Sequence, residues 1–344
     1  PRLNRLRRTA EEVKPDFWLM GEVIHGDYSR WVNGETLHSV TNYALHKALY
    51  SGHNDHNYFE IAHTVKYLQN MGNLDLYNFV DNHDVERIYT KLSNKAHFTP
   101  VHILLYTLPG VPSIYYGSEF GIEGRKERSS DDCLRPALSL DNYETALEDN
   151  PCTALIAALG QIRQHTPALS YGSYAELHLT NRQFAFARDL NDVRVVVTVN
   201  NDDNAASMDL PAGNAVEYIG ALSGQKVAVQ DGRINVTVPA NSGEIWVPAG
   251  DMPEYKPFKV EISVKEETVT DEESIPADSE APSSATEPVH FDPNKSPEDM
   301  SVAELQAAIL AKMANNGPVS DQMKKTVNEN IWHDSLVNWL KSFR

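Results

Sequence analysis

The 344-residue sequence has few cysteines, few basic residues and no long apolar run, and each scarcity excludes a class of protein. Cys133 and Cys152 are too few for a disulfide framework or a cysteine-based metal site, and we expect two free thiols, with a single disulfide as the alternative. No apolar stretch approaches the roughly 18–20 residues of a membrane span. The net charge of −18 argues against nucleic acid and anionic membranes as partners.

The negative charge is concentrated in one part of the chain. Residues 251–300 hold fourteen acidic and four basic residues, and therefore ten of the eighteen excess negative charges. The stretch "EETVTDEESIPADSEAPSSATEP" is also rich in Pro, Ser and Thr, so it cannot bury enough apolar surface to order itself. We therefore predict an acidic disordered linker over residues 250–298.

The first 170 residues alternate between short apolar runs and segments of helical periodicity. Strands are predicted in "FWLMGEV", buried on both faces, in "LDLYNFV" and "GVPSIYYG", and more weakly in "LHSVTNYAL". Helices are predicted over residues 1–14, 58–71, 96–108 and 153–165. This order is typical of parallel β/α units, of which four are visible. Residues 1–170 therefore resemble half of an eight-fold barrel, with a doubly wound sheet as the alternative.

The pattern changes after the last of these helices. "QFAFARDL", "VRVVVTVN" and "GRINVTVPA" alternate with period two between Asn, Asp and Gly turns, which predicts an antiparallel β-sandwich over residues 171–249. Beyond the linker, residues 299–344 are helical again. Ser301 and Glu304 form a capping box, and a second apolar stripe follows, so we predict a helical hairpin tail that either packs on itself or binds a protein partner.

Acidic side chains follow three of the predicted strands. Glu22 ends "FWLMGEV", the tetrapeptide "DNHD" (81–84) ends "LDLYNFV", and Glu119 follows "GVPSIYYG". The carboxyl ends of parallel strands face an active-site mouth, where paired carboxyl groups serve glycosidic cleavage. Salt bridges or helix caps would explain each acid singly. A metal cluster that adds His25 and Asp27 is a further alternative.

The same segments resemble a known family. "FWLMGEV", "FVDNHDVERI" and "LPGVPSIYYGSE" resemble the later signature segments of the α-amylase superfamily, glycoside hydrolase family thirteen, in order and separation. "DDCLRPAL" is similar to a stretch of its cyclomaltodextrinase and neopullulanase branch. The resemblance covers residues 1–248. It implies the second half of a TIM (β/α)8 barrel followed by an antiparallel β-domain, and cleavage of α-1,4-glucans such as starch, maltodextrin or cyclodextrin without a cofactor or metal.

The resemblance also implies roles for individual residues. Glu22 would be the general acid/base, held protonated by partial burial beside Phe17 and Trp18. Asp84 would stabilise the transition state, and His83 would donate a hydrogen bond to the same sugar.

Further residues are expected around these groups. Arg87 is expected to bind substrate or orient the cluster, and His25 and Trp31 to line the sugar site. Asp81 and Asn82 would shape the loop, and Glu119 matches a family position that we interpret as structural.

One element of the family pattern is missing. The nucleophilic aspartate of the family follows a Gly-x-Arg-x-Asp pattern, and nothing of that form precedes Glu22. We expect the chain to begin inside the helix after that strand, and to be inactive alone, because retaining hydrolysis needs a covalent partner for the sugar. A non-catalytic scaffold protein and a metal-dependent hydrolase are the competing functions. The cysteine usage favours the cytoplasm, although no segment of the sequence fixes the location.

Overall fold

The computed structural model describes residues 2–251, 295–297, 300–314 and 340, which fall in two units, Pro1–Glu267 and Thr268–Arg344. Most of the predicted linker and most of the predicted tail lie outside the described residues. No helix among those described is long and apolar enough to cross a membrane.

Four short strands of the first unit are parallel and neighbour one another in chain order. They are β1 (Met20–Gly21), β2 (Ser39–Val40), β3 (Tyr77–Phe79) and β4 (Val111–Ser113). β1 pairs with β2 and β3 with β4, and a parallel bridge from Thr41 to Tyr77 joins the two pairs. Consecutive parallel neighbours are the arrangement of a (β/α) barrel. The predicted half-barrel is therefore confirmed over the doubly wound sheet.

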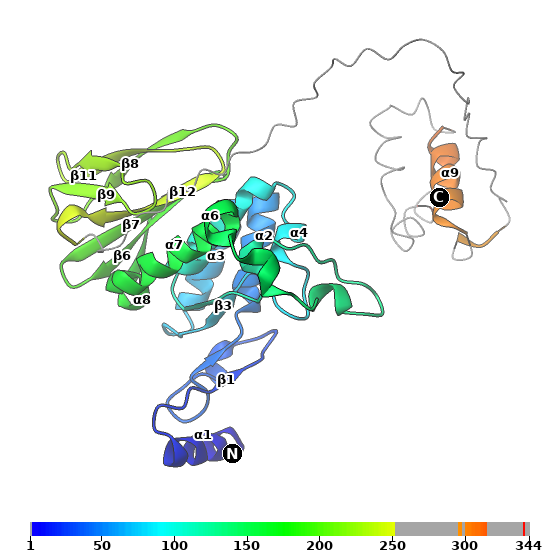
Figure 1. The fold of residues 1–344 in the computed structure, drawn as a ribbon, viewed down its shortest axis with the longest axis horizontal. Coiled ribbons are helices and arrows are strands. Elements are labelled where there is room, and N and C mark those ends of the chain that lie inside the picture. The colour runs from blue at the N-terminus through cyan, green and yellow to red at the C-terminus, as the bar shows by residue number, and fades with distance from the viewer. Residues whose placement is uncertain (1, 252–294, 298–299, 315–339, 341–344) are drawn as a thin grey trace, which may run out of the picture. The chain divides into compact units, whose positions relative to one another are not determined.

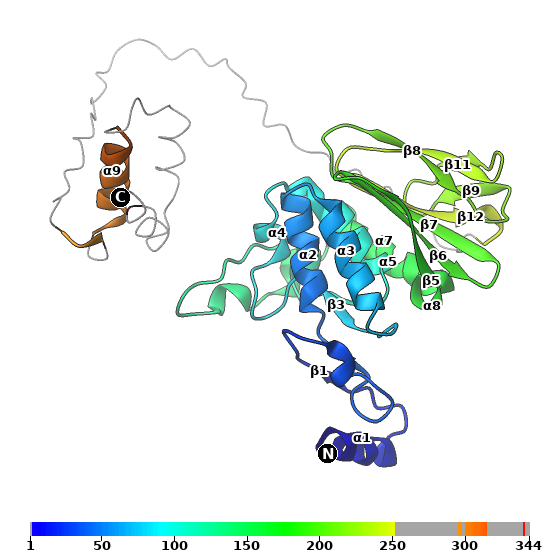
Figure 2. The same ribbon diagram turned by 180° about the vertical axis from the view of Figure 1, so that it is seen from behind.

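Helices connect these strands, and most lie where the sequence predicts them. The α-helices of this part are α1 (Arg2–Val13), α2 (Tyr43–Asn54), α3 (Tyr58–Gln69), α4 (Ile88–Lys91), α5 (Phe98–Thr107), α6 (Ala146–Asp149), α7 (Pro151–His165) and α8 (Pro167–Tyr171). α2 and α3 follow β2 and precede β3 in the chain, and the two helices pack side by side (Figures 1 and 2). α3 ends before Gly72, whose φ of +103° is unfavourable for any residue with a Cβ.

β1 differs from the prediction. The sequence predicts a strand buried on both faces, but Phe17, Trp18 and Met20 are 46%, 45% and 39% exposed. Among the described residues β1 pairs only with β2, so one edge of the strand has no neighbour to cover these side chains. Burial of both faces needs layers on both sides of a sheet, and the described residues do not cover these side chains in that way.

The predicted antiparallel domain is also present. One sheet has the order β10-β9-β12-β7-β6-β5, and β8 and β11 form a separate ribbon. The bounds are β5 (Ser173–Leu179), β6 (Gln183–Leu190), β7 (Val193–Asn200), β8 (Ala206–Pro211), β9 (Glu217–Gly220), β10 (Lys226–Ala228), β11 (Arg233–Val238) and β12 (Ser242–Pro248). In β11, Ile234, Val236 and Val238 are buried between exposed polar residues, the alternation of a half-buried strand.

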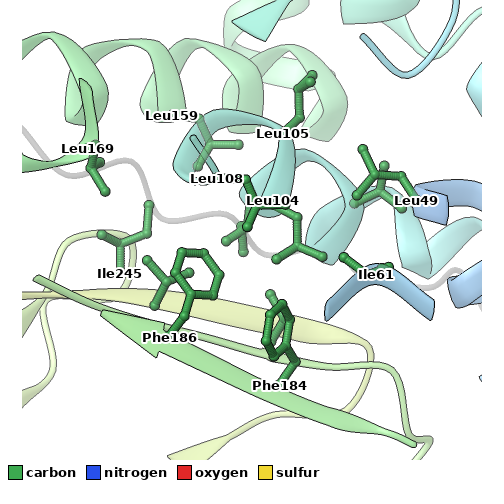
Figure 3. Packing of buried hydrophobic residues seen from close by; sticks show 14 of the residues in the cluster. Leu49, Ile61, Leu104, Leu105, Leu108, Leu159, Leu169, Phe184, Phe186 and Ile245 are labelled. Carbon is green, nitrogen blue, oxygen red and sulfur yellow. The ribbon is translucent and has the colours of Figure 1, made fainter. Parts of the chain in front are cut away.

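One hydrophobic core joins the half-barrel to the antiparallel sheet. α5 packs on β7 and β12, and α8 packs on β6 and β7. Figure 3 shows Leu104 of α5 and Leu108, directly after α5, facing Phe184 and Phe186 of β6, with Ile245 of β12 beside them. All five side chains are buried, so the two parts share apolar surface that neither could bury alone.

The second unit contains one described helix, α9 (Val302–Ala314). Its predicted capping box is present. The Glu304 carboxylate accepts from the Ser301 backbone N–H at 2.7 Å, and Ser301 Oγ accepts from the Glu304 N–H at 3.3 Å. Lys295 also donates to the Glu304 carboxylate at 2.9 Å. The predicted second apolar stripe lies outside the described residues.

The shared core predicts the effect of truncating Phe186. Phe186→Ala removes a fully buried ring and should lower the free energy of unfolding by about 3–5 kcal/mol, with the barrel and the sheet unfolding in one transition. Chemical denaturation followed by circular dichroism measures this. Val216→Ala, at a side chain 84% exposed, should change it by less than about 0.5 kcal/mol. Two separate transitions in the parent chain would contradict a common core.

Candidate active site

Three polar side chains from two strand ends meet at the carboxyl end of the parallel strands. Glu22 directly follows β1, and His83 and Asp84 lie in the loop after β3. One carboxylate oxygen or imidazole nitrogen from each of the three lies within 4.8 Å of those of the other two. β1 and β3 run in the same direction through β2, which brings their carboxyl ends to one edge. Side chains 61 positions apart in sequence therefore face one small space.

Tyr43, at the start of α2, links the two strand ends. Its hydroxyl donates to Glu22 Oε1 at 3.2 Å and accepts from Asn82 Nδ2 at 3.0 Å. Its ring meets Phe79 of β3 edge-on, with centroids 4.9 Å apart. Burial raises the pKa of Tyr43, which keeps the hydroxyl protonated and able to donate. The sequence analysis missed this residue, although Asn42, an N-cap type that accepts from Leu45 N–H, marks where α2 begins.

Two cations from the segment after β4 hold the His83–Asp84 backbone and side chain. Arg135 Nη2 donates to Asp84 Oδ1 at 2.8 Å and Arg135 Nε to the His83 carbonyl at 3.0 Å. Lys126 donates to the Asp84 carbonyl at 2.8 Å. These side chains are close to half exposed, so the ion pair between Arg135 and Asp84 adds little to stability. Its main effect is to fix the position of the Asp84 carboxylate. His83 Nε2 lies 3.4 Å from Asp84 Oδ2.

Asp81 holds the same loop through buried hydrogen bonds. It is 1% exposed, and its Oδ2 accepts from the Ile88 N–H and from Ser118 Oγ, both at 2.7 Å. Burial raises the pKa of the Asp81 carboxyl from 3.8 to about 6, although these hydrogen bonds oppose the rise. The side chain of Asn82 accepts from the Asp84 and Val85 N–H groups. Both residues therefore shape the loop, as expected from the sequence.

Arg87 does not face the site. Its side chain is fully buried, donates to the Leu134 carbonyl at 2.8 Å and to Ser118 Oγ at 3.1 Å, and lies 4.2 Å over the Tyr115 ring. A guanidinium enclosed in this way cannot contact a bound sugar, which corrects the expectation that Arg87 binds substrate. Its partners come from the segments after β4, so it fixes them against the loop after β3.

The surroundings of Glu22, His25 and Trp31 bear on three further expectations. Glu22 is exposed, and Phe17 and Trp18 are about half exposed, so the predicted apolar enclosure of Glu22 is wrong for the described residues. His25 is exposed. Trp31 is half-buried and packs with the apolar cluster around Tyr28. Contacts of His25 and Trp31 with a sugar stay predictions.

Two histidines near the end of α2 have hydrogen-bond partners inside the fold. His53 is fully buried, with Nδ1 donating to the Leu49 carbonyl at 2.6 Å and Nε2 accepting from the Tyr58 hydroxyl at 3.2 Å. His56 Nδ1 lies 2.9 Å from the Asn201 carbonyl. They fill the junction with the antiparallel sheet. Both cysteines are free thiols, as predicted.

Comparison with known sequences identifies the architecture. The model of the α-amylase catalytic domain matches residues 2–172, and that of the α-amylase C-terminal domain matches residues 172–246. This chain belongs to the α-amylase family of glycoside hydrolases. The change from one family domain to the other falls directly before β5 (Ser173–Leu179).

The family relatives are longer than this chain. Neopullulanase 2 of Thermoactinomyces vulgaris is 26% identical over 250 residues, which are 70% of this chain and 41% of that protein. A cyclomaltodextrinase of Thermoanaerobacter pseudethanolicus is 28% identical over 204 residues, 57% of this chain and 34% of that protein. Among solved structures, an α-amylase of Anoxybacillus superposes with a TM-score of 0.62 at 21% identity, covering 74% of this chain and 56% of its own. The chain thus spans less than half the length of the neopullulanase and of the cyclomaltodextrinase.

The burial of Asp81 predicts a pH effect on stability. Because its pKa is higher in the folded chain, the contribution of Asp81 to stability is present below about pH 4 and is lost as the pH rises through about 6. As the pH rises from about 4 to about 6, the free energy of unfolding of Asp81→Asn should increase by roughly 2–3 kcal/mol relative to that of the parent. Urea unfolding at several pH values measures the difference, with the exposed Asp192→Asn as matched control. Parallel pH profiles of parent and Asp81→Asn would contradict the assignment.

Proposed function

We propose that this chain supplies the proton-donating and charge-stabilising groups of a retaining α-glucan hydrolase. The observation that carries the proposal is the convergence of Glu22, His83 and Asp84 within 4.8 Å from the ends of two strands. Glycosidic cleavage requires an acid to protonate the leaving oxygen and an anion to stabilise the oxocarbenium-like transition state. These three side chains offer both groups to one sugar ring.

Each group has a role that follows from its contacts. Glu22 donates its proton to the glycosidic oxygen and later takes one from water. The Tyr43 hydroxyl donates to one Glu22 oxygen, which leaves the other free to carry the transferred proton. Asp84 and His83 bind hydroxyl groups of the sugar next to the bond that breaks. Arg135 donates to Asp84 and holds its carboxylate in place.

The covalent step needs a carboxylate that the 344 residues do not present in the family pattern. No Gly-x-Arg-x-Asp segment precedes Glu22. The proposal is therefore that the nucleophile comes from a polypeptide segment outside these residues and faces Glu22 across the sugar. Retaining enzymes place the acid and the nucleophile about 5–5.5 Å apart.

The names of the relatives guide the choice of substrate. Neopullulanase and cyclomaltodextrinase are among the similar proteins, which supports α-1,4-linked maltodextrins or cyclodextrins as substrates here. His25 and Trp31 are proposed to contact a sugar ring. Residues 299–344 are proposed as a surface for a protein partner or for self-association. A non-catalytic scaffold would have no use for three converging reactive groups, so we favour the enzyme.

The first test is turnover. Residues 1–344 alone should release no sugar from starch or cyclodextrin, because no nucleophile is present to form the glycosyl intermediate. The reading frame extended upstream until it includes a Gly-x-Arg-x-Asp strand should release maltodextrins with retained anomeric configuration, as followed by proton NMR. Turnover by residues 1–344 alone, or inversion by the extended protein, would show that the mechanism is wrong.

The second test removes single groups from that extended protein. Glu22→Gln should lower kcat by about 10²–10⁴-fold through loss of proton transfer, and Asp84→Asn by about 10²–10³-fold through loss of transition-state stabilisation. Asp209→Asn, in the antiparallel domain, is the matched carboxylate control and should retain activity. Full activity of Glu22→Gln would overturn its role as the acid.

A further inference from the structure

A hollow lies at the amino ends of β3 and β4, away from the catalytic groups. It has a volume of about 580 Å³, and its walls include Leu76 just before β3 and Pro109 and Gly110 just before β4. Asn42 and Leu45, which follow β2, also line the hollow. Glu22, His83 and Asp84 are not among its lining residues, so the two sites are distinct. The volume is within the range of sites that enclose a small ligand.

Tyr174, at the start of β5, is one of the residues that line this hollow. Its Oη is buried and has no hydrogen-bond partner among the described residues. Burial raises the pKa of Tyr174, so the group stays a neutral donor and acceptor. A buried hydroxyl without a partner costs free energy, and a ligand hydroxyl placed in the hollow would recover it.

The rest of the lining combines an aromatic face with amide and carboxylate groups. Tyr171, the last residue of α8, is 81% exposed and offers an uncovered ring. Gln69 and Asn73 add amide donors and acceptors to the lining, and Asp75 adds a carboxylate. Aromatic faces pack against the apolar faces of pyranose rings, while planar amides and carboxylates bind their hydroxyl groups. This combination is typical of carbohydrate sites.

The charges of the lining disfavour an anionic ligand. Arg188 is 2% exposed, and each of its three guanidinium nitrogens already donates to the carbonyl of Thr107 or Gly172. Asp75 also contributes a negative charge, which interacts with Arg188 and Arg163. The cation of the hollow is therefore engaged and partly balanced, which leaves a neutral polyhydroxyl compound as the fitting ligand.

We propose that this hollow binds the end of an α-1,4-linked maltooligosaccharide, with Tyr171 packing on one sugar ring and Tyr174 donating to or accepting from its hydroxyl groups. The choice of an α-glucan rests on the proposed function, and the site itself rests on the hollow. Binding here would hold a polymeric substrate on the protein while the catalytic end acts on another part of the molecule.

The test is isothermal titration of residues 1–344 with maltotriose. We expect dissociation constants in about the millimolar range, as for small neutral ligands. Tyr171→Ala should weaken binding at least about fivefold, and Tyr174→Phe about threefold without loss of thermal stability, because its hydroxyl has no protein partner to lose. The matched control is Tyr67→Ala, a half-exposed tyrosine of α3 outside the hollow, which should bind as the parent does.

Asp84→Ala separates the two ends of the molecule. If the hollow is a site, this variant still binds maltotriose there, and Asp84→Ala/Tyr171→Ala, which alters both ends, does not bind it. Binding that is lost only in Asp84→Ala, or retained in full by Tyr171→Ala, would overturn the hollow and leave the proposed function intact. Absence of binding at about 20 mM maltotriose would overturn the hollow as well, since a millimolar site would be saturated. The hydrolytic function is judged separately, by turnover of the extended protein.

Discussion

The hydrogen bonds of the Tyr43 hydroxyl are the interaction on which the candidate active site depends. This group donates to Glu22 and accepts from Asn82, and so couples the end of β1 to the loop after β3. Parallel pairing through β2 brings the two ends near one another, but strands of two or three residues do not fix side-chain directions. The Tyr43 contacts do, because α2 and Phe79 hold the ring.

A buried polar layer beneath the site makes this geometry reproducible. Asp81 and Arg87 are both almost fully enclosed and meet at Ser118, which donates to Asp81 and accepts from Arg87. Burying two charges has a cost, which the hydrogen bonds from Ile88 N–H and to the Leu134 carbonyl offset. The layer joins the loop after β3 to the segments after β4. These segments carry Arg135, which reaches Asp84 from outside.

The sequence predicted the half-barrel and the antiparallel domain because both have strong hydrophobic periodicity and recognisable segments. It also predicted that Glu22, His83 and Asp84 share one site, since all three follow strands. It failed where burial decides. Arg87 has a charged side chain of the kind that often binds ligands, but tertiary packing encloses it. The expected cover over Glu22 needs neighbours that the described residues do not include. α2 was missed because "SVTNYAL" contains both a strand end and a helix start, and Asn42 alone marks the boundary.

The two ends of the parallel strands differ in their chemistry. The carboxyl ends gather ionisable groups that can move a proton, whereas the hollow at the amino ends gathers amides, aromatic rings and an engaged arginine. The central claim concerns the first of these ends. A crystal structure of residues 1–344 with a bound maltooligosaccharide tests it most directly. The account predicts one glucose ring in contact with Glu22, His83 and Asp84 together. Carboxyl groups of Glu22 and Asp84 that face separate environments, with no sugar between them, would contradict it.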